Sequence, residues 1–65
     1  MNKREYLEAL DTLGLTIVGA GPVFGLSKRH AQRYAAGHTA IPGHLAKLVR
    51  VMIARRISPQ TIAEL

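Results

Sequence analysis

Four hydrogen-bond donors in one short segment are spaced so that they fall on one side of a helix. At about 100° per residue, their side chains occupy a stripe about 140° wide, and no acidic residue interrupts it. Cations in such a stripe bind phosphate oxygens, while amide and guanidinium groups pair with the edges of bases. The pattern predicts a nucleic-acid contact surface, and its members are Lys28, Arg29, Gln32 and Arg33.

The residues around this stripe predict how it is held in place. The helix that carries it is expected over 28–36, with Tyr34 on the opposite side, facing a core. Ser27 is a favourable N-cap and Gly37 a favourable C-terminal stop. Gly25 tolerates the positive φ of a tight turn, so a second helix is expected immediately before it.

The preceding helix is expected over 17–24, with Thr16 as its N-cap. Its composition is unfavourable, because Gly21 and Pro22 are poor helix formers and an interior proline removes a backbone bond. We therefore expect a kinked or 3₁₀-like helix, or alternatively one that begins nearer Ala20. Gly21 is also small enough to let the two helices cross closely.

Three further helices complete the predicted fold. Residues 2–13 carry the capping-box pair Asn2 and Glu5. Pro42 or Gly43 opens a further helix, whose apolar positions from Leu45 to Ile53 recur at helical spacing. The Ser58-Pro59 pair opens a last short helix. No strand pattern is present, so we expect one all-α domain over residues 1–65, a compact bundle of about five short helices.

Composition limits the class of protein. The chain has 65 residues, 48% of them hydrophobic, and no cysteine, so its core is small and neither a disulfide nor a thiolate metal site supports it. No segment has the apolar length to span a bilayer, and no signal peptide is visible. We therefore expect a cytoplasmic protein without a membrane partner, and oligomerisation is the remaining source of stability.

The distribution of charge favours a polyanionic partner. Nine Lys and Arg against four acidic residues give a net charge of +5. Seven of the nine cations lie between Thr12 and Ala63, where there is no acidic residue. Such an uncompensated basic block attracts nucleic acid, although basic surfaces can also serve solubility.

Metal binding and catalysis find no support in the sequence. The histidines, His30, His38 and His44, are not spaced at i, i+4, and no cysteine or nearby carboxylate completes a ligand set. The acidic residues lie mostly in the first helix, away from any nucleophile. We therefore expect no cofactor, no metal, no small-molecule substrate and no enzymatic activity.

Two segments of the chain resemble a known protein family. Leu15 to Gly37, LTIVGAGPVFGLSKRHAQRYAAG, resembles the Cro/C1-type, phage-repressor-like helix-turn-helix, and IPGHLAKLVRVMI looks like the fourth helix of that family. The two segments together comprise 36 of the 65 residues. It implies a lambda-repressor-like DNA-binding domain of five helices that works as a dimer on a palindromic operator.

The resemblance also assigns positions. Ile17 departs from it, because the family often has a phosphate-binding glutamine there, and Ala35 stands where an acidic residue is common. We expect His38 and Thr39, just after the recognition helix, to contact the sugar-phosphate backbone. The positions that match DNA-facing ones in the family are Ser27, Lys28, Arg29, Gln32 and Arg33.

The sequence thus predicts a small sequence-specific, repressor-like regulator that binds double-stranded DNA. The alternatives are an antitoxin-like or other protein-interaction module with the same fold and, less favoured because exposed aromatics are scarce, an RNA-binding protein. A weak homodimer completed on DNA is expected, unless its apolar residues merely close the monomer core. Those residues are Met52, Ile53, Ile57, Ile62 and Leu65.

Overall fold

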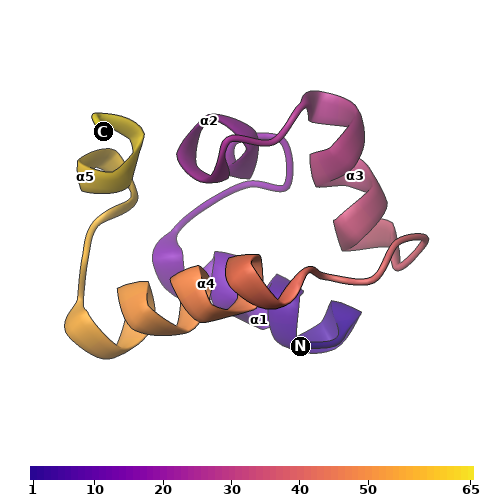
Figure 1. Cartoon of the computed structure of the whole chain (residues 1–65), viewed down its shortest axis with the longest axis horizontal. Helices are drawn as coiled ribbons and strands as arrows, with labels where there is room; N and C mark the ends of the chain where they lie inside the picture. Colours follow the sequence, from indigo (N-terminus) through magenta and orange to yellow (C-terminus); the bar gives the residue numbers. More distant parts are fainter.

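The chain forms five helices and no strand in a computed structural model that describes all 65 residues (Figure 1). The predicted all-α fold is therefore confirmed. The helices are α1 (Lys3–Leu13), α2 (Ala20–Phe24), α3 (Lys28–Ala36), α4 (Gly43–Arg55) and α5 (Pro59–Ala63).

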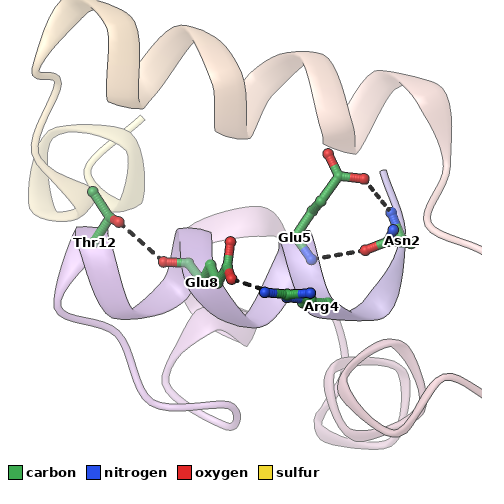
Figure 2. A network of polar contacts seen from close by, with 5 residues as sticks. All are labelled: Asn2, Arg4, Glu5, Glu8 and Thr12. Carbon is green, nitrogen blue, oxygen red and sulfur yellow. Dashed lines mark hydrogen bonds and ion pairs between the residues drawn. The ribbon is translucent and has the colours of Figure 1, made fainter.

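Helix α1 begins and ends where local chemistry predicts. The Glu5 N–H donates to Asn2 Oδ1 at 2.8 Å, and the Asn2 N–H donates to Glu5 Oε1 at 3.2 Å, which completes the capping box (Figure 2). Gly14 ends the helix with φ +72°. On the exposed side, Arg4 and Glu8 form the one ion pair of the protein, with Nε and Oε1 3.3 Å apart.

Helix α2 is shorter than 17–24 and begins at Ala20, as the alternative expectation had it. Thr16 is not the N-cap of the helix as expected, because Gly19 holds that position. The Thr16 Oγ1 instead accepts the Gly19 N–H at 2.9 Å, in the turn before the helix. The Val18 carbonyl, which Pro22 cannot bond, instead accepts the Gly21 N–H at 3.1 Å. The chain thus enters α2 through a tighter, 3₁₀-like turn that satisfies the carbonyl left free by the proline.

The turn between α2 and α3 depends on two glycines. Gly25 has the predicted positive φ of +70°. A side chain at Gly21 would place its Cβ 2.8 Å from the carbonyl oxygen of Leu26, so this position has no room for one. The Leu26 N–H also donates to the Gly21 carbonyl at 2.8 Å. Gly21 is therefore required by the backbone of the turn itself, rather than by the crossing of the two helices as expected.

The core lies where α1 meets α3 and α4, and α5 packs on α2. Tyr6 at its centre is fully buried, and its hydroxyl has no hydrogen-bond partner. Burial, together with the neighbouring Tyr34, raises the pKa of Tyr6 above its ordinary value of 10.0. The other members of the cluster are Ala9, Leu10, Ala20, Tyr34, Ala35, Leu45 and Val49.

The end of α4 corrects one expectation about the dimer surface. Met52 is 0% exposed and belongs to the monomer core, so it cannot contact a second copy. Ile53 remains 37% exposed, and Leu65, beyond α5, is 97% exposed. Ile57 and Ile62 are partly buried.

None of the five helices combines the length and apolar character needed to cross a membrane.

Candidate nucleic-acid interface

Helix α3 lies at the edge of the molecule, at the opposite end of its long axis from α5 (Figure 1). Ser27 caps it by accepting the His30 N–H at 3.2 Å. Gly37 ends it with φ +81°, and the His38 N–H closes the last turn on the Arg33 carbonyl at 3.1 Å. Both ends of the helix are thus set by local contacts, as predicted.

One side of α3 packs against the core, and the other side is exposed to solvent. Ala31, Tyr34 and Ala35 are buried, and α3 packs on α1. The opposite side carries the predicted stripe, and every member of it is exposed. These side chains make no hydrogen bond or ion pair within the protein. The stripe consists of Lys28, Arg29, Gln32 and Arg33.

The electrostatics of this face follow from where the acids lie. Glu5, Glu8 and Asp11 are on α1 and Glu64 follows α5, and none of them pairs with a cation of α3. The guanidinium and ammonium groups of the stripe are therefore unneutralised, and such groups attract phosphate. A further cation lies near, because the Lys3 side chain runs along Gly37 at the end of α3.

The remaining predicted site residues lie at the two ends of α3. The Ser27 hydroxyl is already occupied, since its Oγ lies 2.7 Å from His30 Nδ1 and also accepts the His30 N–H. Only its backbone N–H stays available to a phosphate. His38 and Thr39 are exposed beyond Gly37. Between them and Ser27 lies the whole of α3, which is about 14 Å long at 1.5 Å per residue. The structure therefore does not bring them together with Ser27.

A groove of about 310 Å³ beside the stripe was not found by sequence reasoning. Two of its residues, Ile17 and Val18, come from the turn before α2 and are 41% and 43% exposed. The feature of the sequence that could have indicated the groove is this pair of β-branched residues, which are exposed in a turn. The others come from α3, so Gln32 belongs to both the stripe and the groove. The complete lining is Ile17, Val18, Gln32, Ala35 and Ala36.

Histidine and acidic side chains come together in no group of three that could hold a metal ion. The His30 ring is instead hydrogen-bonded to the Ser27 hydroxyl, and its centroid lies 6.3 Å from that of the Tyr34 ring.

No known family model, curated protein or solved structure matches the chain.

Proposed function

We propose that the protein is a small sequence-specific DNA-binding regulator of repressor type, and that α3 enters the major groove. The supporting observation is the free, acid-free stripe on α3, whose opposite side is fixed to the core. A helix held by a tight turn against a second helix presents its outer side to base edges in helix-turn-helix proteins. Such a regulator would act in the cytoplasm, at the nucleoid.

The residues of the stripe divide by chemistry. Gln32 offers an amide that pairs with adenine N6 and N7, and Arg29 offers a guanidinium that pairs with guanine O6 and N7. Lys28 and Arg33, at the edges of the stripe, bind phosphates and set the register. The Ser27 N–H at the start of α3 adds a phosphate contact. At the far end of the helix, His38 and Thr39 reach the sugar-phosphate backbone.

Salt tests the proposal directly. The affinity for duplex DNA should fall as salt rises, with a log–log slope of about −0.9 for each phosphate that the protein neutralises. Lys28→Ala should make this slope shallower by about one unit. Arg4→Ala should leave it unchanged, because Arg4 is already paired with Glu8. A salt-independent affinity, or no binding to duplex DNA at low salt, would refute the DNA-binding function.

A protein of this kind needs two copies, because one short helix contacts too few base pairs to select a site in a genome. We propose a weak homodimer that DNA completes, with half-sites about 34–36 Å apart. The exposed apolar side chains left for it are those of Ile53 and Leu65, with smaller contributions from Ile57 and Ile62. Their small exposed area fits a dimer that is unstable without DNA.

Sedimentation of the protein with a palindromic duplex measures this stoichiometry. We expect two chains per duplex, and a monomer when DNA is absent at low protein concentration. Ile53→Asp should reduce cooperative binding of the second chain, since it places a charge in the apolar surface. A strict one-to-one complex on a palindromic site would exclude the dimer.

A further inference from the structure

The groove defined by Ile17, Val18, Gln32, Ala35 and Ala36 joins an apolar wall to a polar base-reading side chain. The stripe on α3 otherwise carries cations, so this wall is an apolar surface beside the donors that the proposed function turns toward DNA. Ile17 and Val18 each remain more than 40% exposed. A ligand that fills the groove must therefore present an apolar group next to an amide partner.

The major groove of DNA offers one such group. The 5-methyl of thymine is the apolar feature among the base edges there, and it lies beside the adenine edge that a glutamine pairs with. The groove is continuous with the stripe through Gln32. Ala36 lies four residues beyond Gln32, or about 6 Å along the helix. This distance is less than two base-pair steps of about 3.4 Å each.

We infer that this groove binds the 5-methyl group of thymine, at or within two base pairs of the A·T pair that Gln32 reads. Ile17 and Val18 are the specificity-determining residues, because they supply the apolar wall from outside the recognition helix. The inference rests on the proposed DNA-binding function, which it deepens. The cations that flank the groove bring the polyanion to it, whereas an apolar protein segment would leave Lys28, Arg29 and Arg33 unmatched.

Deoxyuridine scanning tests the inference, because deoxyuridine differs from thymidine only by the missing methyl group. Duplexes that the protein binds are first selected from a random pool, and each thymine of the consensus is then replaced in turn. We expect affinity to fall about fourfold at the groove thymine, the fold-change that corresponds to one buried methyl group, and to stay constant at the others.

A matched pair of variants connects the effect to the groove. Val18→Thr keeps the shape of the side chain but replaces a methyl by a hydroxyl, and it should abolish the thymine-to-uracil difference. Val51→Thr makes the same change on α4 at a residue of similar exposure, 49%, and should leave the difference intact. Circular dichroism should show native helix content in both, since neither side chain lies in the core.

The outcomes separate the two proposals. Duplex binding without a uracil effect at any thymine, or a consensus without thymine, overturns the groove assignment and leaves the DNA-binding function standing. A uracil effect that persists in Val18→Thr also overturns it, because the methyl group is then bound elsewhere. If Val18→Thr changes neither DNA affinity nor base preference, the groove is free for a protein partner. Absence of duplex binding overturns both proposals.

Discussion

Replacing Gln32 by alanine is expected to remove the preference for one base pair of the binding site while leaving general affinity for DNA nearly intact. The amide of Gln32 is exposed and has no partner within the protein, so no internal contact is lost. A bidentate pair with a base contributes about 1–3 kcal/mol of discrimination, or roughly 5- to 150-fold in affinity at that position. Arg29→Ala should produce the same kind of loss at a neighbouring guanine.

The measurement is the consensus selected from a random duplex pool by each variant, followed by affinities for single-base-pair substitutions. Lys28→Ala is the matched control, because a phosphate contact should weaken binding to all sequences alike. If Gln32→Ala selects the same consensus as the natural chain, the base-reading face of α3 has been assigned to the wrong residues.

The second large effect concerns folding and comes from Gly21. Gly21→Ala is expected to destabilise the protein by about 1–3 kcal/mol, a cost typical of overpacking. The new Cβ would lie 2.8 Å from the Leu26 carbonyl oxygen, which is backbone and cannot rotate away. A chain of this size has a total stability of only about 3–10 kcal/mol. The variant should therefore melt at a much lower temperature and lose DNA affinity as the α2–α3 turn opens.

The same substitution at Gly43 provides the control. Gly43 begins α4, and a Cβ there would have no neighbour within 4 Å. Gly43→Ala should raise the stability by about 0.5–1 kcal/mol, because alanine loses less backbone entropy in a helix than glycine. Thermal unfolding followed by circular dichroism compares the two variants. Equal stability of Gly21→Ala and the natural chain would show that the turn can shift to accept a side chain.

The ends of α1 and α3 were predictable from sequence because their caps are local. Asn2 with Glu5 and Ser27 with the His30 N–H each join residues three apart, so neighbouring residue types are enough to identify them. The glycine that ends α3 follows the same short-range rule. Helical periodicity likewise identified the exposed stripe on α3, since side-chain direction on a helix repeats every 3.6 residues.

Other features could not be predicted from neighbouring residue types and were seen only in the structure. Only the packing of the helices shows that Met52 is buried while Ile53 is exposed, although both belong to the apolar pattern of α4. The sequence left two starts open for α2, and the structure selects Ala20, after a turn in which the Thr16 hydroxyl accepts the Gly19 N–H.

The groove beside Gln32 is the clearest case. It is formed by residues of the α2 approach and of the α3 exterior, fourteen or more positions apart in the chain. A motif of adjacent residues cannot contain such a surface, because it exists only once the Gly25 turn has folded the two segments against each other. The amino-acid sequence by itself thus determined the helices and the donors on α3. The relative placement of α2 and α3 decided which apolar side chains stand next to those donors.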